Sequence, residues 1–273
     1  MKEKVKTESK LDKQHVLNEV IKIARRAGEF IRHEGKNFAP EKIEEKGLNN
    51  LVSYVDIEAE QMIAQTLKFT LPDAGFITEE GTETEKSEDY NWVVDPLDGT
   101  TNFMHGLSPH SVSIALSYRD KTIIGVVYEI TRDECFYATD ESKSYLNRQE
   151  IKVSEVKNVS DGLFITGYPY KHFEDMQNFY NVLDHFMRNS HGIRRLGSAA
   201  ADLCYVACGR SEGFFEYGLN PWDVAAGALI VQQAGGKVSD FKNGNDYIFG
   251  KEISANTLGV HDEVLAVLQK HFK

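Results

Sequence analysis

The interpretation of this chain depends most on one stretch, Trp92-Val93-Val94-Asp95-Pro96-Leu97-Asp98-Gly99-Thr100-Thr101-Asn102-Phe103. Its apolar start predicts a buried strand, and two acids three residues apart close that strand. Because unpaired charges at the edge of a dry core are costly, Asp95 and Asp98 are expected to share a positive partner, and carboxylate oxygens suit a hard cation such as Mg²⁺. Gly99 and the two threonines offer the close backbone approach and N–H donors that a phosphate needs. The stretch indicates metal-assisted phosphoryl chemistry, although Asp-Pro and Asp-Gly also occur as plain turn dipeptides.

The composition is that of an ordinary globular protein. The chain has 273 residues, 41% of them hydrophobic, which suffices for one large domain or for two subdomains that share an interface. A net charge of −11 disfavours binding to nucleic acid or to an anionic membrane, but it allows a small phosphorylated substrate if cations neutralise the site. Cys135, Cys204 and Cys208 have no zinc-binding spacing, and their odd number argues against a disulfide framework. Since no apolar run approaches the roughly 20 residues of a membrane span, we expect a cytoplasmic protein.

The apolar pattern predicts a layered α/β fold. Residues 1–10 are charged and are expected to be a disordered tail, while 11–273 form one domain whose subdomains, at about 11–155 and 156–273, have the site in the cleft between them. The first half is predicted to hold helices at 16–31 and 56–71, strands at 75–78 and 92–95, and an antiparallel meander at 111–118, 122–130, 135–139 and 144–153. The second half is predicted to alternate, with strands at 162–168, 213–217 and 237–240 and helices at 171–189, from 198, from 222 and at 261–272.

Three further segments contain residues that suit the same chemistry. Glu79 follows an apolar strand as Asp95 does; the acidic residues that come after it are typical of an exposed loop, but Glu79 lies on the apolar side of that loop. Asp223 lies at the start of an apolar helix, where it is expected either to cap the helix or to bind a metal. The small residues Gly197, Ser198 and Ala199 open another helix, which either lets two elements pack closely or leaves room for a substrate at the helix N-terminus.

Together these segments resemble the inositol monophosphatase family, a lithium-sensitive group of Mg²⁺-dependent phosphatases. Two family motifs are complete, WVVDPLDGTTNF at 92–103 and WDVAAGALIVQQAGG at 222–236. The acids at 79–80, the stretch 46–56 and the helix start at 197–200 follow in family order, so that the resemblance covers nearly the whole chain beyond the tail. It implies an alternating α-β-α-β-α sandwich of the sugar-phosphatase type, usually a homodimer, with inhibition by Li⁺.

The resemblance also implies the ligands of two magnesium ions. Glu79, Asp95 and the carbonyl of Leu97 would hold the first ion. Asp95, Asp98 and Asp223 would hold the second, so that Asp95 bridges the two. Such a pair supplies a nucleophile at neutral pH and neutralises charge in the transition state.

The resemblance also includes a third, outer metal position. Asp56 corresponds to an acid near that position. Family members often carry Asp where this chain has Asn50, and the loss of that charge leaves the occupancy of a third ion open.

The remaining roles implied by the resemblance concern the water and the substrate. Thr100 and Glu79 would orient and deprotonate a metal-bound water, which attacks phosphorus in line without a phosphoenzyme. The substrate would be contacted by Gly99, Thr100, Thr101, Gly197, Ser198, Ala199 and Glu216, the last of these through substrate hydroxyls.

Several substrates remain open at this point. A myo-inositol monophosphate is favoured, because Glu216 suits a polyol and the compact chain suits a monophosphate. Fructose-1,6-bisphosphate, NADP, histidinol phosphate and 3′-phosphoadenosine 5′-phosphate are alternatives with the same metal chemistry. A regulatory or binding protein that keeps the fold is the alternative from another class, and a damaged ligand set or a basic face would favour it.

Overall fold

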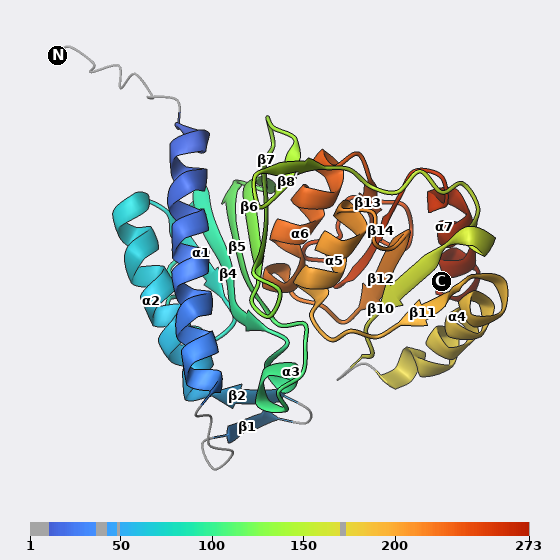
Figure 1. Cartoon of the computed structure of the whole chain (residues 1–273), viewed down its shortest axis with the longest axis horizontal. Helices are drawn as coiled ribbons and strands as arrows, with labels where there is room; N and C mark the ends of the chain where they lie inside the picture. The colour runs from blue at the N-terminus through green and yellow to red at the C-terminus, as the bar shows by residue number, and fades with distance from the viewer. Residues whose placement is uncertain (1–10, 37–42, 48–49, 170–172, 273) are drawn as a thin grey trace.

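The computed structural model in Figure 1 describes residues 11–36, 43–47, 50–169 and 173–272, with the backbone alone over 43–47 and 50–52. The predicted tail at 1–10 and part of the stretch 46–56 lie outside these residues, as does the side chain of Asn50. Helices and sheets alternate across the molecule in five layers (Figure 1). This order confirms the predicted α-β-α-β-α sandwich.

The first two layers are a helix pair and a seven-stranded sheet. Helices α1 (Lys13–Gly35) and α2 (Tyr54–Thr70) cover one face of this sheet. Its strand order is β3 (Gly75–Thr78), β4 (Tyr90–Asp98), β5 (Ser111–Tyr118), β6 (Lys121–Glu129), β7 (Glu134–Thr139), β8 (Ser144–Leu146) and β9 (Gln149–Ile151). A short hairpin of β1 (Ile43–Gly47) and β2 (Asn50–Ser53) precedes α2, and α3 (Thr100–Met104) follows β4.

The other three layers come from the second half of the chain. The central helices α5 (Ala199–Ala207) and α6 (Pro221–Gln233) lie between the two sheets. The second sheet has the order β11 (Gly192–Arg194), β10 (Leu163–Thr166), β12 (Gly213–Tyr217), β14 (Glu252–Asn256) and β13 (Lys237–Ser239). Helices α4 (Met176–Asn189) and α7 (His261–His271) cover its far side, with 3₁₀ turns at Val159–Asp161 and Phe173–Asp175.

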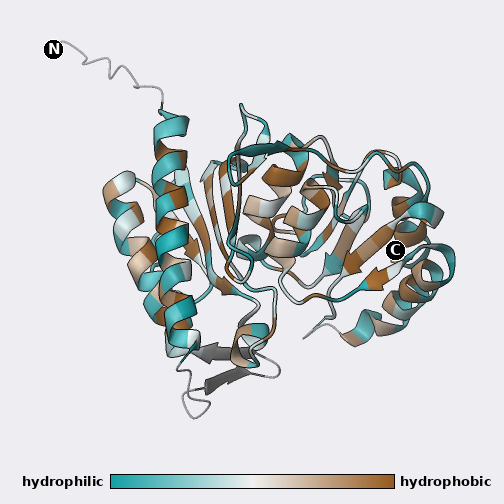
Figure 2. Cartoon of the chain, viewed as in Figure 1, coloured by the Kyte–Doolittle hydropathy of each residue, from teal (hydrophilic) through white to brown (hydrophobic). Residues whose placement is uncertain are grey.

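Hydropathy follows these layers. The strands of both sheets are largely brown in Figure 2, whereas the outer helix α1 is largely teal with brown at intervals. The apolar residues of α1 recur at helical spacing, and Val16, Val20, Ala24 and Ile31 are buried against the first sheet. Among the described residues, no helix combines the length and the apolar character that crossing a membrane requires.

The central helices lie unusually close to their neighbours, because small residues form the contacts. A side chain at Gly125 of β6 would meet the Ala226 carbonyl oxygen at 2.7 Å, and one at Gly227 would meet Leu203 of α5 at 2.7 Å. The apolar residues at 224–231 of α6 are buried throughout. This packing brings the start of α6 against the first sheet, where β4 ends.

Two predictions about elements were wrong or incomplete. The strand predicted at 144–153 is a hairpin of β8 and β9, because Asn147 (φ 46°) and Arg148 (φ 72°) form a tight turn in the left-handed region. The strand at 92–95 continues as β4 to Asp98. The short strands β1, β2, β11 and β14 and the helix α3 were not predicted, whereas the helices α1, α2, α4, α5, α6 and α7 lie close to their predicted positions.

Candidate active site

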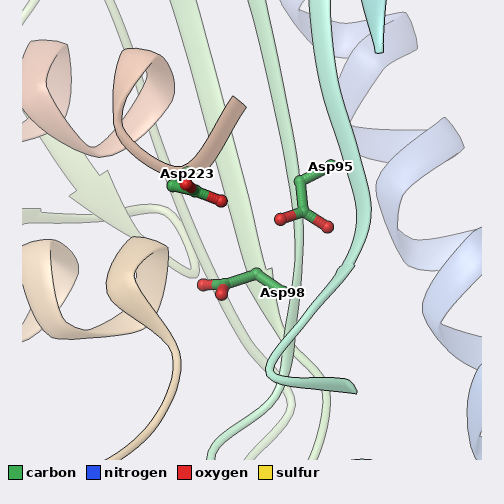
Figure 3. Close-up of side chains that lie close together, drawn as sticks. All are labelled: Asp95, Asp98 and Asp223. Atoms are coloured by element: carbon green, nitrogen blue, oxygen red, sulfur yellow. The ribbon is translucent and has the colours of Figure 1, made fainter. Parts of the chain in front are cut away.

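Three carboxylates from distant parts of the chain form the centre of the site. Figure 3 shows Asp95 and Asp98, at the end of β4, pointing toward Asp223 at the start of α6. Each residue offers an oxygen that lies within 4.8 Å of the oxygens of the other two. Asp95 is buried, with 1% of its surface exposed. Asp95 and Asp98 were expected to lie together from the local sequence, whereas Asp223 was joined to them only through the family resemblance.

An irregularity in β4 explains how both of its acids reach the same side. Residues three apart in a regular strand point to opposite faces of a sheet. Here Asp95 pairs with Ser113 and Asp98 with Ser111, so that β4 has one more residue than β5 over this span. This β-bulge contains Pro96, which cannot donate to the ladder, and it brings Asp95 and Asp98 to one face.

Strand pairing also brings Glu79 to the centre. Strands β3 and β4 are parallel, with Thr78 opposite Val94, and the Glu79 N–H donates to the Val94 carbonyl at 3.2 Å. The side chain of Glu79 contacts the Asp95 carboxyl through a hydrogen bond. Parallel strands end at the same edge of a sheet, so an acid directly after each of them meets the other there.

Hydrogen-bond donors from the second half of the chain hold Asp98 and Asp223 in place. Asp98 accepts hydrogen bonds from the Ser198 hydroxyl at 2.6 Å and from the Ala200 N–H at 2.8 Å. Asp223 accepts from the Asn220 N–H at 2.6 Å in a capping box. Asp223 thus takes part in the cap of α6, whose N-cap is Asn220, and it also lies in the acidic cluster, while its role as a metal ligand stays a prediction.

The electrostatics of this cluster are unfavourable without a cation. Burial raises the pKa of Asp95 well above its ordinary value, and the neighbouring carboxylates raise it further. Burial also raises the pKa of Asp98 to about 6, although the hydrogen bonds from Ser198 and the α5 backbone lower it in part. The pKa of Asp223 is raised well above its ordinary value by burial and by the charges of Glu79 and Asp98. Acids in such a cluster resist ionisation unless positive charge joins them.

The donor set fits a hard divalent cation. All the groups that converge are carboxylate oxygens, which Mg²⁺ prefers over nitrogen or sulfur ligands. The carbonyl of Leu97 lies in the bulge between the two acids, and the Thr100 hydroxyl is 3.0 Å from it. The cluster, the adjacent Glu79 and this carbonyl are the residues that would hold two ions.

Thr100 and Asp56 lie beside the cluster. Asp56 of α2 accepts hydrogen bonds from the N–H (2.8 Å) and the hydroxyl (2.6 Å) of Ser53, and its other oxygen lies 3.0 Å from the Thr100 hydroxyl. Burial raises the pKa of Asp56, against the effect of these bonds. Asp56 thus holds Thr100, and the cluster of three does not include it. Its role as an outer metal ligand stays a prediction.

The predicted phosphate segments meet one another. Gly99 has φ 91°, and a side chain on it would come within 3.0 Å of the Gly197 carbonyl oxygen. Gly197 has φ 102°, and Ser198 is the N-cap of α5. The first donors of α5 are used by Asp98 and Ser198, while Ala199 is buried and Thr101 is exposed on α3. The segments lie together, and their contact with phosphate stays a prediction.

Glu216 is buried on β12, near groups that the sequence analysis did not single out. Burial raises its pKa to about 8, and the positive charge of Arg195 opposes that rise. Asp202 of α5 is also buried, and its Oδ1 has no hydrogen-bond partner among the described residues. A side chain at Gly167 would overlap the Glu216 carboxyl, at 2.0 Å, so Gly167 makes the space that the carboxyl fills.

Asn102 is another residue that sequence reasoning missed. Its amide donates to the Pro109 carbonyl and to the Leu196 carbonyl, both at 2.8 Å. It therefore ties the segment after β4 to the segment before α5. The signal that could have identified Asn102 was its place inside the motif at 92–103. For Arg195, the signal was the pair of adjacent arginines just before Gly197.

A family model described as the inositol monophosphatase family matches residues 12–272. The chain belongs to this family. It is 40% identical over 255 residues to the Nus factor SuhB of Escherichia coli strain K12, an alignment that covers 92% of this chain and 94% of that relative. The family fold and its acidic cluster support a phosphatase-type enzyme, and members of the inositol monophosphatase family generally use Mg²⁺.

Solved structures of the family agree with this fold. The extragenic suppressor protein suhB from Bartonella henselae is 36% identical, with a TM-score of 0.89 over 94% of this chain and 99% of that one. An inositol monophosphatase from Anabaena (Nostoc) sp. PCC 7120 is 31% identical, with a TM-score of 0.85 over 94% and 96% of the two chains.

Proposed function

We propose that the protein hydrolyses a phosphate monoester with Mg²⁺, and that a myo-inositol monophosphate is its substrate. The observation that carries the proposal is the cluster of the buried Asp95 and the partly buried Asp98 and Asp223, with Glu79 beside it. Nothing in a packing role requires four acids to converge, and each of them costs free energy when it is charged and unpaired. The family membership supplies the reaction class.

The residues divide into ligands and groups that act on the water. Glu79, Asp95 and the Leu97 carbonyl would hold one Mg²⁺, and Asp95, Asp98 and Asp223 a second. When bound, such ions make a nucleophile from water at neutral pH and neutralise charge on the phosphoryl group. Glu79 would accept the proton of the attacking water. Thr100, held between Asp56 and the Leu97 carbonyl, would orient that water.

The phosphate is proposed to bind where the two halves of the chain meet. The backbone of 99–101 and of 197–199 would supply donors, with Gly99 and Gly197 leaving the room that a side chain would fill. Inhibition by Li⁺, a third ion near Asp56 and a homodimer are further proposals that rest on the family.

A substrate panel tests the proposed function. Purified protein with Mg²⁺ is expected to turn over inositol 1-phosphate faster than fructose-1,6-bisphosphate, NADP, histidinol phosphate or 3′-phosphoadenosine 5′-phosphate. The reason is that a buried carboxyl such as Glu216 penalises a substrate that has no hydroxyl at the position that pairs with it. The measurement is kcat/KM for each compound by phosphate release. A preference for NADP or the bisphosphate would overturn the substrate assignment, and no turnover of any phosphomonoester would overturn the reaction class.

The role of Glu216 has a separate test. Glu216→Gln is expected to lower kcat/KM for inositol 1-phosphate by roughly 10-fold, the effect of losing one hydrogen bond. An aryl phosphate without hydroxyls serves as the matched control substrate, and its turnover should change little. An equal loss on both substrates would place Glu216 among the residues that support the metal site or the fold.

A second candidate function comes from the relatives named Nus factors. A transcriptional role of this kind would act through a protein contact, because the net charge of −11 opposes direct contact with nucleic acid. A folded but inactive variant separates the two functions. If such an inactive variant complements a Nus-factor defect, the second candidate is favoured. If only the active protein complements it, the first is favoured.

A further inference from the structure

A second buried acid on α2 reaches toward the site. Glu60 has 0% of its surface exposed, and its carboxylate lies at the loop that follows β3. One oxygen accepts the Thr82 N–H at 2.8 Å and the Thr82 hydroxyl at 2.7 Å, and the other accepts the Glu80 N–H at 2.8 Å. Three donors of one short segment therefore bind a single carboxylate that comes from a helix 20 residues earlier.

The position of Glu60 on α2 is tied to that of Asp56. Residues four apart share one face of a helix, and here that face is buried, with Ala59, Ile63 and Leu67 packed into the first core. Asp56 reaches Thr100, and Glu60 reaches 80–82. One face of α2 thus contacts both Thr100 and the segment 80–82, which border the acidic cluster. The packing of α2 fixes where the carboxylates of Asp56 and Glu60 lie.

The hydrogen bonds of Glu60 restrain the backbone directly after Glu79. The N–H of Glu79 donates to the Val94 carbonyl of β4. The next N–H along the chain, that of Glu80, donates to the Glu60 carboxyl. Beyond this point the chain turns at Gly81 (φ 68°) into an acidic loop at 83–89. Two of the four acids of that loop have partners of their own, Glu83 with Lys68 and Asp89 with Arg119, so the bonds from Glu60 act on the short stretch between Glu79 and that loop. Three hydrogen bonds to one carboxyl hold this stretch at its first and third residues.

We propose that Glu60 is a positioning residue, which fixes Glu79 for metal binding and proton transfer through the backbone of 80–82. This inference deepens the proposed function and rests on it. It assigns to Glu60 a role in the geometry of the site beyond stabilising α2.

The test compares Glu60→Gln with Glu58→Gln, the same chemical change on an exposed residue of the same helix. The two oxygens of Glu60 each accept a backbone N–H, and a glutamine presents its NH₂ to one of them, so at least one bond is lost. Hydrogen exchange at the amides of Glu80 and Thr82 is expected to speed up by roughly 10-fold or more in Glu60→Gln and to stay unchanged in Glu58→Gln.

Two further measurements separate positioning from mere stability. Mg²⁺ binding, followed by calorimetry without substrate, is expected to weaken by roughly 10-fold in Glu60→Gln, and kcat at saturating Mg²⁺ is expected to fall while KM changes little. Circular dichroism and thermal unfolding establish that each variant is folded. Should Glu60→Gln fail to fold, Thr82→Val removes only the hydroxyl donor, and it is expected to shift exchange and Mg²⁺ affinity in the same directions by a smaller factor.

The outcomes distinguish this proposal from the proposed function. Faster exchange at 80–82 with unchanged Mg²⁺ affinity and kcat would overturn positioning and leave Glu60 as a structural residue. Unchanged exchange would show that the three bonds do not hold the loop. Wild-type protein that hydrolyses no phosphomonoester would overturn the proposed function, and the exchange and calorimetric measurements would still decide the role of Glu60.

Discussion

Asp95→Asn is expected to lower kcat by about 10³-fold or more, while the metal-free protein stays folded and becomes more stable. Asp95 is the acid proposed to bridge both ions, so its loss removes charge from each of them, and interactions of this kind typically contribute several kcal/mol to the transition state. The increase in stability has a separate cause. Burial and three neighbouring acids raise the pKa of Asp95, which means that its charged form destabilises the fold.

The measurement pairs single-turnover and steady-state rates with thermal unfolding in chelator. Asp73→Asn, which changes an exposed aspartate just before β3, is the matched control and should alter neither quantity. Near wild-type kcat with an unchanged Mg²⁺ requirement would show that Asp95 is structural. A lower melting temperature of the metal-free variant would contradict the account of repulsion within the cluster.

The central chemistry could be predicted because it depends on local sequence. An apolar run closed by Asp95 and Asp98 predicts a buried strand end with a need for positive charge, and the structure has the two acids at that place. The layers were also predictable, since apolar periodicity identifies α1 and the meander of β5, β6 and β7. Asp223 could be assigned from sequence to a helix start, where it both caps α6 and joins the cluster.

The rest depends on contacts between distant residues. The β-bulge at Pro96 decides that Asp95 and Asp98 share a face, and no periodicity argument contains it. The spacing of Glu60 puts it on the same face of α2 as Ile63 and Leu67, but periodicity does not identify its partners at 80–82, which come from another element. Asn102 likewise acquires its role only when Leu196, 94 residues away, lies beside it.

Removal of divalent cations with excess chelator is expected to abolish turnover of the wild-type protein and to lower its melting temperature, more at about pH 8 than at about pH 5. The loss of turnover follows because hard oxygen ligands without a cation leave no strong nucleophile among the side chains. Undiminished turnover in chelator would contradict the metal assignment. Sodium chloride at matched ionic strength controls for screening of the surface charge.

The pH dependence follows from the direction of the pKa shifts. The folded protein raises the pKa of Asp98 to about 6 and that of Glu216 to about 8, and it raises the pKa of Asp95 and of Asp223 as well. Below their pKa in the unfolded chain, near 4, these acids are neutral in the folded and the unfolded state and do not lower the free energy of unfolding. As the pH rises through the folded pKa values, the unfolded chain binds fewer protons than the folded one, so the metal-free fold loses stability between about pH 4 and about pH 8.

Mg²⁺ reverses this penalty by pairing with the charged form, so its stabilising effect should grow over the same pH range. Thermal unfolding at several pH values, with Mg²⁺ and with chelator, measures the difference directly. Asp95→Asn should show a smaller Mg²⁺-dependent shift at every pH, because it removes both a ligand and a source of repulsion. A shift that is the same at about pH 5 and about pH 8 would mean that the acids of the cluster do not change their ionisation when the metal binds.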